Sequence, residues 1–201
     1  MPDNLKSCLL YCVAIPEDTK IDVVTLVEMW SAEGLVKLKG ITNLIDVGHH
    51  YIDFLSSRCL IEYVGFKEMS LQYDDNIIGT VEREVIKVHD VLRDMAIYIG
   101  ERDEQWVFAS TQHLQNFPVE EVTRKCKRLS LGHNDIQHLP TDLECTRLVS
   151  LVLAHNTKLT EVPTPSFLNI MSLKVLDLSC CTLITSLPLR WGNVDSLSLS
   201  I

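Results

Sequence analysis

The C-terminal part of the chain repeats one leucine pattern three times. Each copy has the form Leu-x-Leu-x-x-Asn or Leu-x-Leu-x-x-Cys, and the copies begin at Leu129, Leu151 and Leu176. The offsets of 22 and 25 residues match the period of leucine-rich repeats, in which every unit contributes one short strand. A unit of this size cannot bury its own leucines, so successive units must stack in register. Residues 111–201 are therefore predicted to form about three leucine-rich repeats in a short solenoid.

Two sets of positions within these repeats have different expected roles. The last position of each pattern should satisfy backbone groups where the strand turns away, which is a structural role. It is occupied by Asn134, Asn156 and Cys181. If the chain is a stand-alone interaction module, the positions between the two leucines are expected to lie on a concave strand face and to choose a partner. Examples of these positions are Ser130, Val152 and Asp177.

The N-terminal half shows helical periodicity instead of this repeat. A first helix is expected over Leu5–Tyr11, ended by Pro16, and its apolar positions start so early that we expect it to begin upstream. A second helix is expected between an Asp22 cap and a terminating Gly34. A third is expected from a Thr42 cap to about Arg58.

Strand signals follow these helices. Cys59–Val64 and Val85–Val88 are predicted to be two strands of a β-wing, separated by an acidic loop at Tyr73–Asn76. A closing helix is predicted to begin near Asp90. Helices followed by a β-wing and a closing helix give the order of a winged-helix domain. The predicted fold is therefore a mostly helical α+β winged-helix domain over residues 1–110, followed by the α/β-type repeats.

The junction between the second wing strand and the closing helix is the main candidate site. It places His89 and Asp90 beside a helix N-terminus, where free N–H groups and the positive end of the helix dipole favour an anion such as a nucleotide phosphate. Asp90 can cap this helix by accepting a backbone N–H. The apolar positions expected on one face of the helix are Val91, Leu92, Met95, Ala96 and Ile99. A plainer interpretation makes Asp90 only a cap and His89 only a polar residue at the strand end.

Three motifs in a fixed order carry a family resemblance. They are Leu5-Lys6-Ser7-Cys8 with Tyr11-Cys12 and Ile15-Pro16-Glu17-Asp18, then Trp30-Ser31-Ala32-Glu33-Gly34, then Val88-His89-Asp90. Together with the leucine-rich tail, they resemble the winged-helix end of plant NB-LRR disease-resistance proteins of the coiled-coil class. The resemblance covers nearly the whole chain. Ile15 replaces the family's usual aromatic residue and Val88 its methionine, but the His-Asp pair is retained.

The resemblance implies a function for the pair. His89 would contact the β-phosphate of bound ADP, and Asp90 would help to hold the closed, resting arrangement. The chain would then belong to an intracellular receptor of plant defence, in which ADP or ATP controls a switch. The repeats would restrain the switch and recognise a pathogen effector or a guarded host protein.

The resemblance also implies that the nucleotide site needs more than this chain. The phosphate-binding loop would lie in an upstream nucleotide-binding domain, and no GxxxxGK[ST] run occurs here. We therefore expect the chain alone neither to bind ADP or ATP strongly nor to hydrolyse ATP.

Composition narrows the possible partners and location. Residues 1–110 carry 10 Lys and Arg against 19 Asp and Glu, whereas residues 111–201 carry 8 of each. This excess of acid disfavours nucleic acid, whose phosphates it repels. No apolar run approaches the roughly 20 residues of a membrane span. The seven cysteines include no CxxC pair, and with no signal-peptide pattern they favour reduced thiols in the cytoplasm.

Two other classes of function are considered. The first is a stand-alone leucine-rich-repeat interaction module without nucleotide function. The second is an enzyme that uses Cys180 or Cys181 as nucleophile and His138 or His155 as base. Spacing fixes no carboxylate partner for either histidine, so we assign no catalytic residue.

A metal site is not expected either. The pair His49-His50 has only Cys59 near it in sequence, and zinc needs four convergent ligands. Cys8 and Cys12 share a helical face with leucines and are expected to be buried small hydrophobic residues.

Overall fold

The computed structural model divides the chain into two compact units, each with its own β-sheet. The first unit comprises residues 1–13 and 17–94, and the second comprises residues 14–16 and 95–201. The structure describes residues 3–16, 19–37, 43–73, 76–103, 106–119, 126–143, 145–163, 170–185, 187 and 198–200. Glu17 and Asp18 of the first motif, and Pro188 after the third repeat, lie outside the described residues.

The first helix, α1 (Asp3–Ala14), is longer than its predicted core and is buried almost all round. Every side chain from Cys8 to Ala14 is at most 6% exposed. A helix that is apolar on all sides is stable only when it is packed on all sides. The Tyr11 hydroxyl donates a hydrogen bond to the Glu33 carboxylate, which ties α1 to the end of the second helix.

The second helix, α2 (Val23–Glu33), has the predicted start and end. The Asp22 carboxylate accepts a hydrogen bond from the Thr25 N–H at 2.7 Å, as an N-cap residue does. Gly34 has φ = 81° and its N–H donates to the Ser31 carbonyl oxygen at 2.8 Å. This left-handed conformation favours glycine, so the sequence signal and the helix end coincide.

The third helix, α3 (Leu44–Ser56), begins at a different cap from the predicted one. The Asn43 side chain accepts a hydrogen bond from the Ile45 N–H at 3.0 Å, whereas Thr42 lies outside the described residues. Thr and Asn are both good caps, and only the backbone geometry distinguishes them. Gly48 faces α2 so closely that a Cβ there would lie 2.3 Å from Cγ2 of Val27.

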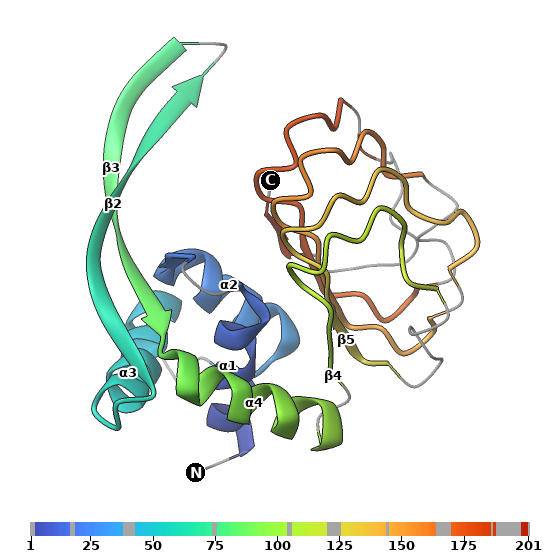
Figure 1. Ribbon diagram of the computed structural model, residues 1–201. Coiled ribbons are helices and arrows are strands. Elements are labelled where there is room, and N and C mark those ends of the chain that lie inside the picture. Colours follow the sequence, from blue (N-terminus) through green and yellow to red (C-terminus); the bar gives the residue numbers. More distant parts are fainter. Residues whose placement is uncertain are drawn as a thin grey trace. The chain divides into compact units, whose positions relative to one another are not determined.

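The wing is a twisted antiparallel hairpin of β2 (Ile61–Tyr73) and β3 (Asn76–Val88) (Figure 1). A two-residue strand, β1 (Ile21–Asp22), pairs with the base of β3, which gives the order β1-β3-β2. The predicted strands were too short. Ile61, Val85 and Ile86 at the base are buried, whereas Phe66 is 63% exposed and Val81 37%, so the apolar residues further out are not covered as those of a core strand are. Asp74 and Asp75 of the predicted loop lie outside the described residues.

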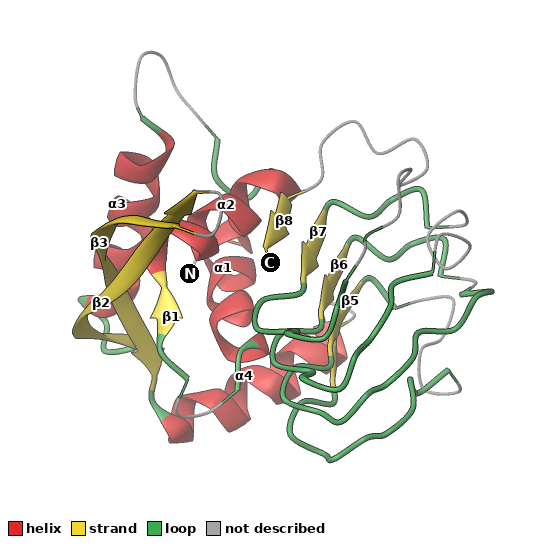
Figure 2. Cartoon of the chain, turned by 90° about the horizontal axis from the view of Figure 1, so that it is seen from above, coloured by secondary structure: helices red, strands yellow, loops and turns green. Residues whose placement is uncertain are grey.

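The helix α4 (Asp90–Asp103) follows the wing, and a five-stranded parallel sheet follows α4. The strands, in spatial order, are β4 (Trp106–Phe108), β5 (Arg128–Ser130), β6 (Ser150–Val152), β7 (Val175–Asp177) and β8 (Ser198–Ser200). Figure 2 shows β5 to β8 side by side. Leu129, Leu151 and Leu176 lie in register, as the repeat pattern predicts. Strand β4 was not predicted, because Trp106–Phe108 precedes the first leucine pattern and does not share it.

The asparagine positions of the repeats satisfy backbone groups, as predicted. The Asn134 amide donates to the carbonyl oxygens of Ala109 (2.7 Å) and Leu131 (3.0 Å). In the next repeat, the Asn156 amide makes the equivalent hydrogen bonds and donates to the carbonyl oxygens of Leu131 (2.9 Å) and Leu153 (2.7 Å). The Cys181 thiol donates to the Leu153 carbonyl oxygen at 3.3 Å. Each side chain therefore joins one repeat to the preceding repeat.

A second periodic feature lies immediately before this ladder. The residues before the three ladder positions have a positive φ of 53° to 61°, and they are His133, His155 and Cys180. Thr111, 22 residues before His133, has φ = 60°. Non-glycine residues rarely adopt this left-handed conformation, so its recurrence reflects the turn that every repeat must make.

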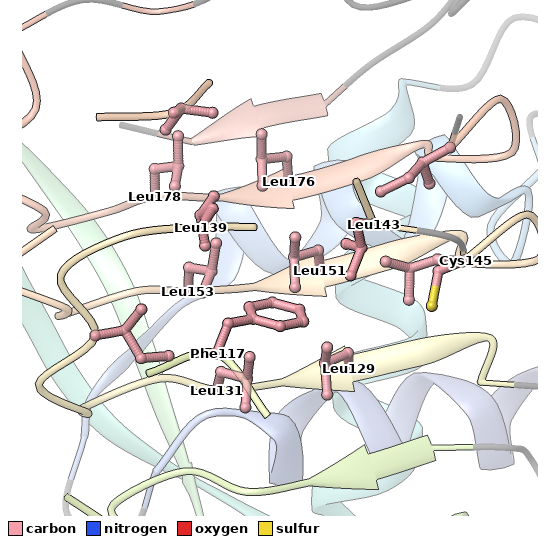
Figure 3. Packing of buried hydrophobic residues seen from close by; sticks show 14 of the residues in the cluster. Phe117, Leu129, Leu131, Leu139, Leu143, Cys145, Leu151, Leu153, Leu176 and Leu178 are labelled. Carbon is pink, nitrogen blue, oxygen red and sulfur yellow. The ribbon is translucent and has the colours of Figure 1, made fainter. Parts of the chain in front are cut away.

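The leucines of the repeats pack into one core on the inner side of the sheet (Figure 3). The residues labelled there are Phe117, Leu129, Leu131, Leu139, Leu143, Cys145, Leu151, Leu153, Leu176 and Leu178. All of them are buried. No helix within the described residues is long and apolar enough to cross a membrane.

The close approach of Gly48 to Val27 predicts that Gly48→Ala destabilises the first unit. The added methyl group must displace Val27, and overpacking of this kind costs about 1 to 3 kcal/mol. His50→Ala, at an exposed position of α3, is the matched control and should leave stability nearly unchanged. Urea unfolding of the two variants measures the difference, and equal stability would show that α2 and α3 are not in close contact here.

The ladder predicts unequal effects of its members. Asn156→Ala removes two donated hydrogen bonds and one accepted from the Ile136 N–H at 3.2 Å, and leaves buried backbone groups unpaired. Each such group costs about 1 to 3 kcal/mol. Cys181→Ala removes one weak thiol bond and should cost less. Thermal unfolding of both variants tests this order, and the reverse order would contradict the ladder.

Candidate functional site

His89 links β3 to α4 and is exposed, as is Asp90. The His89 carbonyl oxygen accepts hydrogen bonds from the N–H groups of Leu92 (2.9 Å) and Arg93 (3.0 Å). The residue whose carbonyl accepts the first intrahelical bonds is the N-cap residue. His89 therefore occupies the N-cap position of α4.

Asp90 was predicted to be this cap, and that prediction was wrong by one residue. Because β3 continues to Val88, the chain turns at His89 and Asp90 is already the first residue of α4. An acidic side chain in the first turn interacts favourably with the positive end of the helix, by about 0.3 to 1 kcal/mol. Asp90 thus stabilises α4 through its charge.

The junction has some of the elements of an anion site. The first amides of α4 have no partners within the helix, and the exposed His89 imidazole stands next to them. The Asp90 carboxylate lies at the same end of α4 and opposes a second negative charge there. A phosphate bound here would therefore need further donors or cations from another part of a protein.

The apolar face of α4 differs from the predicted one. Ala96 is buried, as expected, but Val91 is 74% exposed, Met95 51% and Tyr98 63%. Cζ of Arg102 lies 5.5 Å from the centroid of the Tyr98 ring. The sequence shows that α4 has apolar positions at helical spacing, but only packing decides which of them are covered.

The positions predicted to choose a partner on the strand face are not accessible. Ser130 is 0% exposed, Val152 1% and Asp177 4%. The Ser130 hydroxyl donates a hydrogen bond to the Ala14 carbonyl oxygen and lies 2.8 Å from the Ser110 hydroxyl. Within the second unit, residues 14–16 thus lie against β5. The prediction that these positions form an open recognition face was wrong.

The cysteines and histidines considered for catalysis are not brought together. Burial raises the pKa of the Cys181 thiol to about 11, so it remains protonated, and its proton is donated to a backbone carbonyl. Cys180 is exposed, and His138 lies at an isolated bridge to Glu161. Within the described residues, no hydrogen bond joins either cysteine to His138 or His155. No group of three potential metal ligands forms there either.

The seven cysteines all lie in the described part of the chain, and none of them forms a disulfide bond. Cys8 and Cys12 are fully buried, and burial raises the pKa of the Cys12 thiol to about 12. Cys59 is exposed at the turn between α3 and β2.

A pair of stacked histidines was not anticipated. His133 and His155 occupy equivalent positions in successive repeats, and their ring centroids lie 4.1 Å apart. Partial burial and the neighbouring His155 lower the pKa of His133 below its usual 6.5. Their spacing of 22 residues, the same as that of Leu129 and Leu151, was the signal in the sequence that could have predicted the stack.

Comparison with known proteins assigns the first part of the chain. The family model described as Disease resistance protein Winged helix domain matches residues 15–96, which include α2, α3, the wing and the His89–Asp90 junction. Residues 15–96 belong to this winged-helix family. The match confirms the winged-helix order predicted from the sequence.

Similarity to disease resistance proteins extends beyond the winged-helix domain. The chain is 30% identical over 200 residues to the disease resistance protein RFL1 of Arabidopsis thaliana, covering 97% of this chain and 21% of that protein. It is 30% identical over 198 residues to the disease resistance protein RPS5 of the same plant, covering 96% of this chain and 20% of that protein. The chain thus spans about a fifth of the length of these relatives.

The lowered pKa of His133 predicts that acid destabilises the second unit. The unfolded chain binds a proton at His133 more readily than the folded chain does, so this contribution is complete above pH 6.5 and shrinks as the pH falls below that value. Burial raises the pKa of Asp177, so Asp177 changes the stability with pH in the opposite direction. A variant of His133 alone is therefore compared with the wild type. We expect His133→Asn to lose less stability than the wild type between about pH 7.5 and about pH 5.5 in urea unfolding. Equal losses would contradict this role.

Proposed function

We propose that this chain forms the regulatory part of an intracellular plant defence receptor controlled by ADP and ATP. The observation that carries the proposal is the winged-helix family match over residues 15–96 together with the exposed His89 at the start of α4. In this proposal an upstream nucleotide-binding domain supplies the phosphate-binding loop. His89 adds a contact to the β-phosphate of ADP, at the end of α4 where free amides favour an anion.

We propose that the winged-helix domain and the nucleotide-binding domain bind the phosphate together. His89 and the first amides of α4 offer donors, but Asp90 places a negative charge beside them. A phosphate would therefore be held only when cations of the nucleotide-binding domain are also present. We propose accordingly that the chain alone does not bind ADP strongly and is not an enzyme.

We also propose that the second unit is a leucine-rich-repeat solenoid that restrains the switch and recognises a pathogen effector or a guarded host protein. The parallel strands in register and the asparagine ladder support the solenoid. The buried strand positions Ser130, Val152 and Asp177 argue against the alternative of a free-standing interaction module that reads a partner with that face.

Asp90→Val tests the switch in a receptor that joins this chain to a P-loop nucleotide-binding domain. The substitution removes the favourable charge at the start of α4 and disturbs His89 beside it, a loss of about 0.3 to 1 kcal/mol. A receptor whose resting and active states are nearly balanced should then shift towards the active state. Expression in leaf tissue should cause cell death without a pathogen cue.

Asp94→Val is the matched control, because Asp94 is an exposed acidic residue one turn further along α4. It should remain silent at an equal protein level. A silent Asp90→Val variant, or equal cell death from both variants, would overturn the role proposed for the junction.

A further inference from the structure

A hollow of about 330 Å³ lies at the base of the wing, within the first unit. It is lined by Val23 and Val24 of α2, His49 of α3, and the consecutive residues Val81 to Glu84 of β3. The hollow has apolar walls at α2 and polar side chains along β3. It is distinct from the His89–Asp90 junction.

Beside the hollow, one edge of β3 has no strand paired to it within the described residues. The short β1 pairs with β3 only at Ile86 and Val85, and the chain then turns into α2. From Glu84 outwards, β3 is paired with β2 on one side and, within the described residues, with no strand on the other. Figure 1 shows this part of the hairpin continuing beyond the helices of the unit. A strand edge of this kind presents backbone groups that an added strand can pair with.

One oxygen of Asp22 and one oxygen of Glu84 accept no hydrogen bond within the described residues. They are Oδ2 of Asp22 and Oε2 of Glu84, and both atoms are buried. Oε2 of Glu84 lies 3.3 Å from Nδ1 of His49, but without hydrogen-bond geometry. Arg83 reaches only the other oxygen of Asp22, at 3.3 Å. The Glu84 side chain as a whole is 37% exposed, so a cation brought by a partner can approach its carboxylate from the solvent side.

Charge along the edge identifies the kind of partner. Glu82 and Glu84 alternate with Arg83, and Glu82 lies opposite Glu68 of β2 in the register. Like charges directly opposite each other in a sheet repel, so this face of the wing favours a positive charge. Residues of an added strand that lie opposite Glu82 and Glu84 would be two positions apart and on one face.

We propose that the edge of β3 from Val81 to Glu84 docks a basic, extended segment of a partner protein. The segment adds as a strand beside β3, and its lysine or arginine side chains reach Glu82 and Glu84. Its intervening side chains lie over the apolar wall made by Val23 and Val24. This surface is independent of the nucleotide contact proposed for His89, and neither depends on the other.

Calorimetric titration of the 201-residue chain with a short peptide of alternating lysine and valine tests the proposal. We expect saturable binding that weakens as salt is raised, because exposed charge pairs are screened. Glu82→Gln and Glu84→Gln should each weaken it by about tenfold, the size expected when a hydrogen bond to a charged group is lost. Glu28→Gln, at an exposed position of α2 outside the hollow, should not change it.

Two further probes separate strand addition from simple charge attraction. The same peptide with methylated backbone amides should bind weakly, because it cannot pair with the strand edge. Spermine, a free polyamine, should bind no more tightly than this methylated peptide. No saturable binding of the basic peptide, equal binding of the methylated peptide or of spermine, or equal loss in Glu28→Gln would overturn the proposal. Circular dichroism of each variant confirms that it is folded, and a variant that unfolds is replaced by Glu82→Asp or Glu84→Asp, which should bind more weakly than wild type.

Discussion

Backbone hydrogen bonding between repeats is the constraint on which the second unit depends. Each of its strands has only three residues, so none can persist without a neighbour in register. Where the strands end, the amides of Asn134 and Asn156 continue the pairing by bridging the carbonyl oxygens of successive repeats. The left-handed residues before them make the turn that brings each asparagine inward. The leucines can pack into a core free of unpaired polar groups because these backbone carbonyls accept hydrogen bonds from the asparagines.

The winged-helix domain is held together by different interactions. Its helices are fixed by local caps at Asp22, Gly34 and Asn43 and by the close contact of Gly48 with Val27. Its wing exposes apolar side chains such as Phe66 and Val81 and is held by the ladder between β2 and β3.

The two candidate surfaces of the first unit differ in the charge of the group that each would bind. The His89–Asp90 junction combines the first amides of α4, which have no partners within the helix, with the carboxylate of Asp90, which opposes an anion. The edge of β3 carries the exposed carboxylate of Glu82 and the partly exposed carboxylate of Glu84, which a basic segment would complement. The strand face of the repeats is closed by contrast, because Ser130 and its neighbours are buried and residues 14–16 lie against β5.

The features that depend on local chemistry or on strict periodicity could be predicted from the sequence. The Asp22 cap, the Gly34 helix end, the register of Leu129 with Leu151 and Leu176, and the roles of Asn134 and Asn156 all follow from residue type and spacing, and the structure agrees with them. Tertiary structure alone decided the features that depend on what packs against what. The length of the wing, the strand β4, the exposure of Val91 and Met95 and the burial of Ser130 belong to this group. The burial of a residue is decided by neighbours that are distant in the chain. The residue type of a strand or of a serine does not show which segment will pair with it or cover it.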